Sequence, residues 1–464
     1  MNIKTGRHGL VLFFAIGFGF IHAKAIGDEL HVPSQFQTIQ SAIDAAADDD
    51  EIIVAGGHYA EAIDFQGKQI AVRSINGAGS VVLDASAMQA PAVTMIDVPS
   101  GAVLKGFTIR GGTGVPLKFN SIGGGAYVLN SSPLFEDCVF RDMKIVGAGA
   151  GAFIDGGSPQ FFSCTFLENS ATADGGGIYA RATNINIAQC NFQRNHAEYG
   201  AAIRLLRSNA TVSECLIVAN GGGATGGGGG ISATLSTYSV RNCIIADNGA
   251  LSGRGLGGDS CTIDVQNTVI WGTQTGQVAH ENSVVSIERS NIRACGGSGA
   301  NWYGVIGNDL GGNLDTDPRF RDLLGPDGVA RSGDEDYTLK PNSPCIDAGN
   351  NAHVAADAFD LDGDGDTTEP IPFDLRGLPR FIDDPGTPDS GAGVAPIVDI
   401  GAYEFQGTSA LADINADGVT NGVDLGTLLA TWGPCVEGAA CRADLNGDGA
   451  VDAIDLTILM KSWN

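Results

Sequence analysis

The sequence predicts an all-β solenoid whose coils are about 25 residues long, followed by a small all-α domain built on two calcium loops. Three observations predict this architecture. A cysteine recurs through the middle of the chain at nearly constant spacing. Each copy follows a turn of small residues and a short apolar strand. An acidic loop of calcium-binding pattern then occurs twice near the C-terminus.

The repeat defines the body of the protein. Cys138, Cys164, Cys190, Cys215 and Cys243 are separated by 26, 26, 25 and 28 residues. Short strands at this period, without a long amphipathic helix, are typical of stacked β-coils. Equivalent residues then stack about 4.8 Å apart, and stacked Asn side chains can pass amide hydrogen bonds between coils. The residues that accompany the cysteines are Phe140, Phe166, Phe192, Ile217 and Ile245, then Asn169, Asn195, Asn220 and Asn248, with Thr268 and Ser290 continuing the cysteine position.

The cysteines could form a disulfide framework, because an exported chain with 10 Cys invites one. However, the five repeated cysteines share one inward strand position and cannot all pair with one another. Buried thiols behave as small hydrophobic groups. We therefore expect reduced cysteines in the core, and no cysteine-based active site, because no basic residue recurs beside them.

Residues 1–25 have the pattern of a secretory signal. Lys4 and Arg7 precede an apolar run, and Ala23-Lys24-Ala25 forms an A-x-A cleavage site. The alternative is an uncleaved anchor, for which the run is short. No other segment has the pattern of a membrane span. The expected location is extracellular, either free or attached to the cell surface.

Residues 26–100 are expected to form an N-terminal cap and the first coils. Thr38 can cap a short helix that carries Ile39, Ile43 and Ala47 on one face. A strand then starts at Glu51. The helix would cover the open end of the solenoid, where unpaired strand edges would otherwise invite aggregation.

Five segments carry a family resemblance: 32–47, 56–61, 104–112, 343–349 and 398–405. They resemble the first and closing coils of pectate-lyase-like right-handed parallel β-helix proteins. The resemblance implies that fold, with central repeats over 101–300 and closing coils with an acidic loop over 301–407. Because the β-helix scaffold hosts lyases, hydrolases, adhesins and structural domains, the resemblance implies a fold more than an activity.

Alignment of the coils gives weak candidates for catalysis. Asp155 and Arg181 fall in one outward row, and Arg204 falls in the next row. The resemblance implies either a lyase, in which an Arg or Lys removes a proton acidified by calcium, or a hydrolase that uses paired carboxylates. The alternative is a cross-coil ion pair on a solvated face. The rows are Leu129, Asp155, Arg181, Leu206 and Thr234, and Tyr127, Phe153, Tyr179, Arg204 and Ser232, whose aromatic members could hold a sugar chain.

The two C-terminal loops are the most specific chemical signal in the chain. Each places oxygen side chains at positions 1, 3, 5, 9 and 12 and Gly at position 6, where Gly tolerates the sharp turn. A backbone carbonyl at position 7 completes the oxygen set that Ca²⁺ prefers. The expected metal ligands are Asp413, Asn415, Asp417, Val419, Asn421 and Asp424, and Asp444, Asn446, Asp448, Ala450, Asp452 and Asp455.

Each loop is followed by one amphipathic helix, and residues 408–464 resemble a type I dockerin module. That resemblance implies a cohesin-like protein partner for residues 413–463. Position 12 is Asp in both loops, whereas EF-hands have Glu there, and Asp suits the dockerin resemblance. An insert between the two copies could be closed by a Cys435–Cys441 disulfide. A third acidic stretch, Asp360–Asp366, begins like a calcium loop but has Ile371 at position 12, so it is either a calcium site with other ligands or a solvated turn.

The formal net charge of −27 excludes nucleic acid as a partner, because nucleic-acid binding needs a basic surface. It also disfavours polyanionic glycans unless bound Ca²⁺ bridges the like charges. The leading prediction is a secreted β-helix protein that binds polysaccharide or degrades it as a lyase or glycoside hydrolase, tethered by a calcium-dependent dockerin-like module. The alternatives are a noncatalytic adhesion or structural protein, and an enzyme whose site lies in the loops at 113–122 or 296–335.

Overall fold

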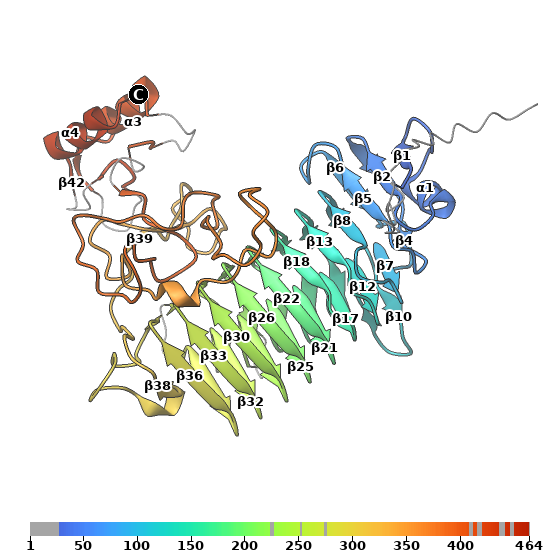
Figure 1. The fold of residues 1–464 in the computed structure, drawn as a ribbon, viewed down its shortest axis with the longest axis horizontal. Coiled ribbons are helices and arrows are strands. Elements are labelled where there is room, and N and C mark those ends of the chain that lie inside the picture. Colours follow the sequence, from blue (N-terminus) through green and yellow to red (C-terminus); the bar gives the residue numbers. More distant parts are fainter. Residues whose placement is uncertain are drawn as a thin grey trace, which may run out of the picture.

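The computed structural model describes residues 27–463, apart from 223–226, 251–252, 273–275, 408–411, 415–419, 436–440 and 446–449. The chain forms a parallel β-helix of about ten turns (Figure 1). Three long sheets, here called A, B and C, run along its axis, and neighbouring strands within each sheet are parallel. This confirms the predicted solenoid. The predicted signal over 1–25 lies outside the described residues.

Sheet A has twelve strands and forms the face toward the viewer in Figure 1. In spatial order its strands are β1 (Glu29–Val32), β2 (Glu51–Val54), β5 (Ala71–Ser74), β8 (Val103–Lys105), β13 (Leu134–Glu136), β18 (Gln160–Phe162), β22 (Asn184–Ala188), β26 (Asn209–Ser213), β30 (Thr237–Arg241), β33 (Thr262–Gln266), β36 (Val284–Glu288) and β38 (Asn308–Asp309).

Sheet B has ten strands and sheet C has nine. Sheet B comprises β3 (Gly57–Tyr59), β6 (Val81–Asp84), β9 (Thr108–Arg110), β14 (Val139–Arg141), β19 (Thr165–Leu167), β23 (Asn191–Gln193), β27 (Leu216–Val218), β31 (Ile244–Ala246), β34 (Val269–Trp271) and β37 (Asn291–Ile292). Sheet C comprises β4 (Ile63–Asp64), β7 (Val93–Ile96), β12 (Ala126–Leu129), β17 (Ala152–Asp155), β21 (Ile178–Arg181), β25 (Ile203–Leu206), β29 (Ile231–Thr234), β32 (Leu256–Asp259) and β35 (Val278–Glu281).

Shorter elements connect and close these sheets. They are α1 (Ile39–Ala45), β10 (Val115–Pro116), β11 (Ser121–Ile122), β15 (Lys144–Ile145), β16 (Gly147–Ala148), β20 (Ser170–Ala171), β24 (His196–Ala197), β28 (Gly221–Gly222), η1 (Gly304–Ile306), β39 (Phe320–Asp322), β40 (Asp336–Leu339), η2 (Asn351–His353), α3 (Gly422–Ala430), β41 (Gly433–Pro434), β42 (Ala450–Val451) and α4 (Ala453–Lys461).

The cysteine ladder lies inside the solenoid, as predicted. The five repeated cysteines are buried free thiols, as are Cys261, Cys295 and Cys345. The residue before each repeated cysteine turns the chain from sheet A to sheet B with φ of 48–54°, as at Glu214 and Asn242. This left-handed corner points the corner residue outward and the cysteine inward.

The asparagine ladder also forms. The amide nitrogen of Asn169 donates to the Oδ1 of Asn195 at 3.0 Å, and Asn195 donates to Asn220 at 2.9 Å. Each Oδ1 also accepts a backbone N–H of the preceding coil, as Asn195 does from Asn169 at 3.1 Å. Full satisfaction of these buried amides makes the ladder a stabilising element.

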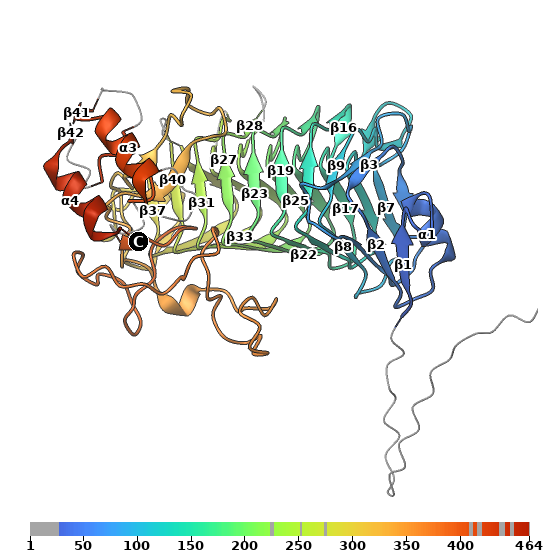
Figure 2. The ribbon, with the colours of Figure 1, turned by 90° about the horizontal axis from the view of Figure 1, so that it is seen from above.

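Helix α1 covers the N-terminal end of the solenoid, at the end far from the C-terminal helices (Figure 2). The Thr38 hydroxyl accepts the Ser41 N–H at 3.1 Å, which confirms the predicted cap. Ile39 and Ile43 are fully buried in the core, as expected. The expectation for Ala47 was wrong, because the helix ends at Ala45 and Ala46 is the residue that turns inward.

The segment 315–407, here called the closing segment, packs back along the side of the solenoid (Figures 1 and 2). The outward side chains of β27 and β31, including Leu216, Val218 and Ile244, are buried against it. The same apolar cluster takes in Ile414 and Leu459 of the C-terminal region. The last coils of sheet B are therefore covered.

Candidate functional site

The outward rows predicted on sheet C are present. Asp155 pairs in register with Arg181 on the neighbouring strand, and Tyr179 pairs with Arg204. The Arg181 guanidinium donates to the Asp155 carboxylate. Arg204 has a different partner, Asp174, at 3.2 Å. The structure thus places the three weak catalytic candidates on one face but separates Arg204 from Asp155.

These ion pairs weaken the case for an arginine base. The hydrogen bond that Arg181 donates to Asp155 raises the pKa of Arg181, whereas a catalytic base needs a lowered pKa. The Arg204 side chain is also fixed by hydrogen bonds to the hydroxyls of Ser232 at 3.3 Å and Thr234 at 3.0 Å. Both guanidinium groups therefore have positioning and stabilising contacts on this face.

The aromatic row on sheet C cannot stack on sugar rings in the way the sequence suggested. The ring centroids of Tyr127 and Phe153 are 5.9 Å apart, and those of Phe153 and Tyr179 are 5.2 Å apart. The rings face one another along the solenoid axis, and Phe153 and Tyr179 are buried. The Arg181 guanidinium lies 5.7 Å from the centre of the Phe153 ring. The row is a stabilising ladder whose faces are already occupied.

A groove of about 440 Å³ opens on sheet C beyond this ladder. The groove forms because the outward side chains of this row become small at Gly257 and Ala279. Arg204, Asp259 and Glu281 are among the residues that line it. These two carboxylates are exposed and occupy paired positions on neighbouring strands.

A second groove of about 540 Å³ runs over the outer face of sheet A. Its outward residues carry amide and hydroxyl groups, and Arg241 and Asp264 are the only charged residues among those that line it. The Asn209 amide donates to Asn184 Oδ1 at 2.8 Å, which links two coils across the surface. The outward rows are Asn184, Asn209, Thr237 and Thr262, and Gln160, Asn186, Thr211, Ser239 and Asp264.

The sequence analysis missed the sheet A rows, although a signal for them exists. The rows fall six and four residues before each repeated cysteine, as Asn184 and Asn186 do before Cys190. On this face, polar residues that point outward alternate with apolar residues that point inward. The alternation occurs at a fixed distance in sequence before each repeated cysteine. Asp259 and Glu281 were missed because their coils lack the cysteine that sets the alignment.

The closing segment borders the sheet A groove. The ring of Phe359 stacks on that of Phe162 at 4.1 Å, and Phe162 belongs to the outward row of sheet A next to Gln160. Farther along that row, Ala188 and Ser213 are buried. The groove is thus open on the sheet and bounded on its sheet B side.

The closing segment brings its own buried charges to the solenoid. Arg380 and Glu214 are both fully buried, with Nη2 and Oε2 3.3 Å apart. Burial raises the pKa of Glu214 to about 8, against the opposing effect of Arg380. Burial likewise raises the pKa of Asp399 to about 8 and of Asp347 to about 7. These groups lie away from both grooves and hold the closing segment in place.

The predicted C-terminal calcium ligands are described in part. Asn415, Asp417, Val419, Asn446 and Asp448 lie outside the described residues. Among the described ligands, the position-12 carboxylates Asp424 and Asp455 are fully buried.

Each position-12 carboxylate ties the two ends of its loop together. Asp424 accepts the N–H of Ile414 at 2.8 Å and the N–H of Asn421 at 2.8 Å. Asp455 does the same with Leu445 and Asp452, at 2.7 Å each. Carboxylate oxygens are the ligands that Ca²⁺ prefers. The described part of each loop therefore fits a calcium site.

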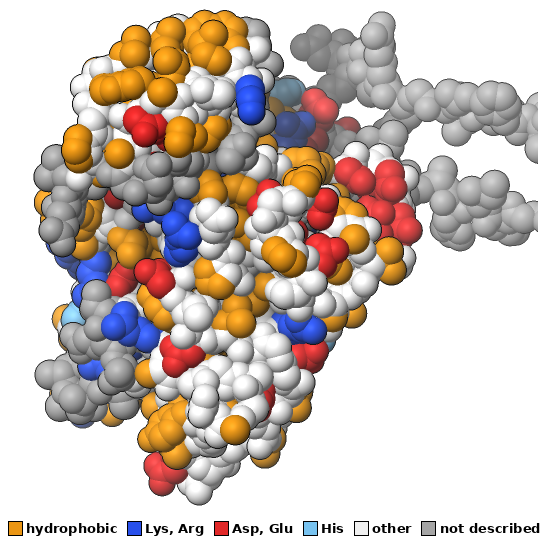
Figure 3. Space-filling view, turned by 90° about the vertical axis from the view of Figure 1, so that its left-hand side faces the viewer, with side chains coloured by type: hydrophobic (Ala, Val, Ile, Leu, Met, Phe, Trp, Pro, Cys, Tyr) orange, Lys and Arg blue, Asp and Glu red, His pale blue; other side chains and the backbone are white. Residues whose placement is uncertain are grey.

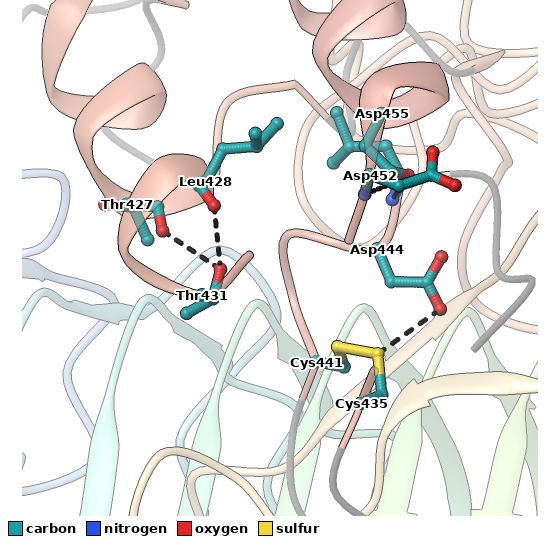
Figure 4. Close-up of a disulfide and its surroundings, with 9 residues drawn as sticks. Thr427, Leu428, Thr431, Cys435, Cys441, Asp444, Asp452 and Asp455 are labelled. Carbon is teal, nitrogen blue, oxygen red and sulfur yellow. Dashed lines mark hydrogen bonds between the residues drawn. A yellow bond between two sulfur atoms is a disulfide. The ribbon is translucent and has the colours of Figure 1, made fainter. Parts of the chain in front are cut away.

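The predicted Cys435–Cys441 disulfide is present, with a Cα–Cα distance of 5.7 Å. Figure 4 shows Asp444, the first expected ligand of the second loop, pointing toward it. Asp444 Oδ2 lies 3.7 Å from Cys435 Sγ, a contact rather than a hydrogen bond because a disulfide sulfur has no proton to donate. The disulfide fixes the start of the second loop and removes both cysteines as metal ligands.

Comparison with known proteins supports the fold. Residues 100–238 match the family described as the right handed beta helix region. The chain is a right-handed parallel β-helix. No curated protein sequence matches it.

The solved structures to which the chain is similar are distant from it. Pectate lyase Pel9A is 14% identical with a TM-score of 0.40, covering 79% of this chain and 90% of its own. The carrot pectin methylesterase is 11% identical with a TM-score of 0.33, covering 62% and 90%. The bacteriophage CBA120 tailspike protein 2 domain is 14% identical with a TM-score of 0.41, covering 64% and 47%. In the part of the chain described here, no helix has both the length and the apolar character needed to cross a membrane.

Proposed function

We propose that this protein is exported and binds a polysaccharide chain along the outer face of sheet A, and that a calcium-loaded, dockerin-like C-terminal region tethers it to a protein partner. The observation that carries the proposal is the groove of amide and hydroxyl groups on sheet A. Sugar hydroxyls both donate and accept hydrogen bonds, and amide and hydroxyl side chains complement them.

The repeat of the solenoid suits a polymer. Five strands, β18 to β33, line the groove, and their spacing of about 4.8 Å gives a track of about 19 Å. A chain of several sugar rings can lie along such a track and meet the same kinds of groups at each coil. This regularity favours a polymer over a small ligand.

The charge of the groove selects the class of polysaccharide. Arg241 and Asp264 offset each other, and the chain as a whole carries a formal charge of −27. A polyanion such as pectate or alginate would be repelled at long range. The expected ligand is an uncharged glycan.

Binding measurements test this assignment. Isothermal titration calorimetry with xylan, galactomannan and mixed-linkage glucan should detect binding to at least one, and polygalacturonate and alginate should bind more weakly. The N186A/T211V double variant should weaken binding at least tenfold by removing an amide and a hydroxyl. T165V, on the outer face of sheet B, is the matched control and should bind normally. Normal binding by the double variant would refute the sheet A site.

A second candidate function, hydrolysis, rests on the sheet C groove. Asp259 and Glu281 occupy paired positions on neighbouring strands, about 4.8 Å apart at the backbone. Retaining glycosidases place two carboxyl groups about 5 Å apart. Release of new reducing ends that is abolished by both D259N and E281Q would support hydrolysis. Unsaturated products would instead indicate a lyase.

The tether is supported by matched surfaces on the two C-terminal helices. Val423 and Ile454 are exposed at equivalent positions, and so are Leu429 and Met460. Hydrophobic side chains gather over this end of the molecule, at the top of Figure 3. Trp432 is also 48% exposed, which is unusual for so large an apolar group. Such a patch suits a cohesin-like protein partner.

Cohesin binding with and without calcium tests the tether. The wild-type protein should bind an immobilised cohesin panel in Ca²⁺ and be released by a chelator. The L429D/M460D variant should lose binding in Ca²⁺ and keep its far-UV circular dichroism. L235D, at an exposed leucine on the solenoid, is the control. Binding by the double variant would refute the assigned surface.

A further inference from the structure

The acidic loop of the closing segment contains several carboxylates and no basic residue. Residues 355–370 contain six Asp and Glu and no Lys or Arg. Carboxylate oxygens of Asp357, Asp362 and Glu369 lie within 4.8 Å of one another, and those of Asp360, Asp362 and Asp364 do so as well. Asp362 is common to both groups, so the two groups adjoin and together contain five carboxylates.

Two of these carboxylates each have one buried oxygen without a hydrogen-bond partner. Asp357 is fully buried, and its Oδ1 has no hydrogen bond. The Oε1 of Glu369 is also buried and unpaired. Buried carboxylates without a partner are strongly disfavoured, whereas coordination of a metal satisfies them. This observation is independent of the number of acidic residues in the loop.

The backbone already holds the carboxylates in position. The Leu361 N–H donates to Asp357 Oδ2 at 2.7 Å, whereas Oδ1 has no hydrogen bond. The Gly365 N–H donates to Asp360 Oδ1 at 2.9 Å. Gly365 has φ of 87°, a conformation that glycine adopts without strain, and this turn brings the two halves of the loop together.

We propose that this loop is a calcium site in which Asp357, Asp362 and Glu369 are the central ligands and Asp360 and Asp364 complete the set. Oxygens on opposite sides of a Ca²⁺ ion are about 4.6–5.2 Å apart, twice the usual Ca–O distance. The ligand oxygens of each group lie within 4.8 Å of one another, close enough to share one ion. Five carboxylates suit Ca²⁺ better than Mg²⁺, which keeps several waters and takes one or two carboxylates.

This ligand set explains the residue at the twelfth position of the loop. Ile371 is buried with Val354 and Val398 in a small apolar cluster, so it serves the core and supplies no ligand. Asp357 precedes the loop and Glu369 lies at its tenth position. They replace the carboxylate that the calcium pattern places at position 12.

The site would also stiffen the border of the sheet A groove. Phe359, which stacks on Phe162, lies between the ligands Asp357 and Asp360. A bound cation would fix the backbone on both sides of this ring. The inference adds a metal site to the proposed function and does not depend on glycan or cohesin binding.

Calcium stoichiometry of the full-length protein tests the inference. After gel filtration in low micromolar free Ca²⁺, metal analysis of the D357N/E369Q variant should show one ion fewer per chain than the wild type. D366N changes the charge of the same loop outside both carboxylate groups and should keep the wild-type count. The test compares the number of ions per chain between the variant and the wild type. The result therefore does not depend on how many ions the C-terminal loops bind.

Hydrogen exchange guards against misfolding of the variant. In the wild type, Ca²⁺ should slow amide exchange over residues 355–371 at least tenfold, and D362N alone should abolish that protection without changing exchange in sheet C. An unchanged ion count in D357N/E369Q, or Ca²⁺-independent exchange over 355–371 in the wild type, would overturn the assignment.

Discussion

Arg380 is the buried cation that joins the closing segment to the solenoid, and its replacement should loosen that junction. The Arg380 side chain is fully buried, donates to the Gly401 carbonyl at 2.6 Å and lies 3.3 Å from Glu214. Glu214 sits at the left-handed corner between sheets A and B. The R380M variant keeps most of the volume of the side chain and removes its charge.

The magnitude follows from the geometry. At an effective dielectric constant of about 20, opposite charges 3.3 Å apart attract by about 5 kcal/mol. Removal of one partner of a buried pair typically costs about 3–5 kcal/mol, because the other is left uncompensated. We therefore expect R380M to lower the free energy of opening of the closing segment by about 3–5 kcal/mol above about pH 8, where Glu214 is ionised.

The effect should depend on pH. Glu214, Asp399 and Glu404 all have pKa values raised by burial, and Arg380 opposes each rise. Without Arg380 their folded-state pKa values rise further above those of the unfolded chain, so the folded state binds more protons. Stability then falls as pH increases. Because the wild-type groups give up their protons only near pH 8, the loss in R380M should be nearly constant below about pH 7 and should grow above about pH 8.

Native-state hydrogen exchange over residues 372–405 measures this opening directly. E214Q/R380M, which removes both charges, should recover at least half of the loss. R141M is the matched control, because Arg141 pairs with Asp142 in solvent and should contribute less than about 1 kcal/mol. A loss below about 1 kcal/mol in R380M, or a loss that does not change with pH, would refute the reasoning.

Four further predictions follow from the same structure. N195L should cost about 3 kcal/mol or more in urea unfolding, because it leaves two donors of Asn169 and the carbonyl of Phe166 unpaired. Thiol titration should find no reactive cysteine in the native protein and eight after denaturation, because the eight free cysteines are buried. The wild-type closing segment should lose stability between about pH 5 and pH 8, since burial raises the pKa of Asp347 to about 7 and that of Asp399 to about 8, and the unfolded state gives up those protons first. Removal of calcium should abolish a calorimetric transition of residues 412–463 and leave that of the solenoid, because bound metal supplies much of the folding free energy of a small domain.

Each of these has a direct check. N184L changes an exposed Asn of the same repeat and should cost less than about 0.5 kcal/mol. Native thiols that react within minutes would contradict the buried ladder. Stability of the closing segment that rises from pH 5 to pH 8 would contradict the pKa shifts. A single calorimetric transition unaffected by chelation would argue against the C-terminal calcium sites.

The local pattern of the chain was sufficient to predict the solenoid. The period of Cys138 to Cys243, the stacked asparagines and the Thr38 cap all depend on residues that are neighbours in one coil or at the same position of adjacent coils. The Cys435–Cys441 disulfide spans a separation of six residues and was predictable for the same reason. The C-terminal metal ligands remain a prediction from loop spacing.

The candidate sites were only partly predictable. Coil alignment placed Asp155, Arg181 and Arg204 on sheet C, but it could not assign Asp174 as the partner of Arg204. It also could not show that the rings beside Phe153 occupy one another's faces. The amide and hydroxyl rows of sheet A lie at fixed distances in sequence before the cysteines. They could be predicted from that spacing once the outward side of the strand was known.

The sequence by itself determined the repeat, the inward and outward faces of each strand and the pattern of the calcium loops, because strand periodicity and ligand spacing are local properties of the chain. The tertiary structure alone decided which faces stay open. Arg380 meets Glu214 across 166 residues, Phe359 meets Phe162 across 197, and the closing segment buries the last coils of sheet B. Such pairings depend on how a long, irregular segment folds back over the solenoid, and no periodicity in the chain encodes that path.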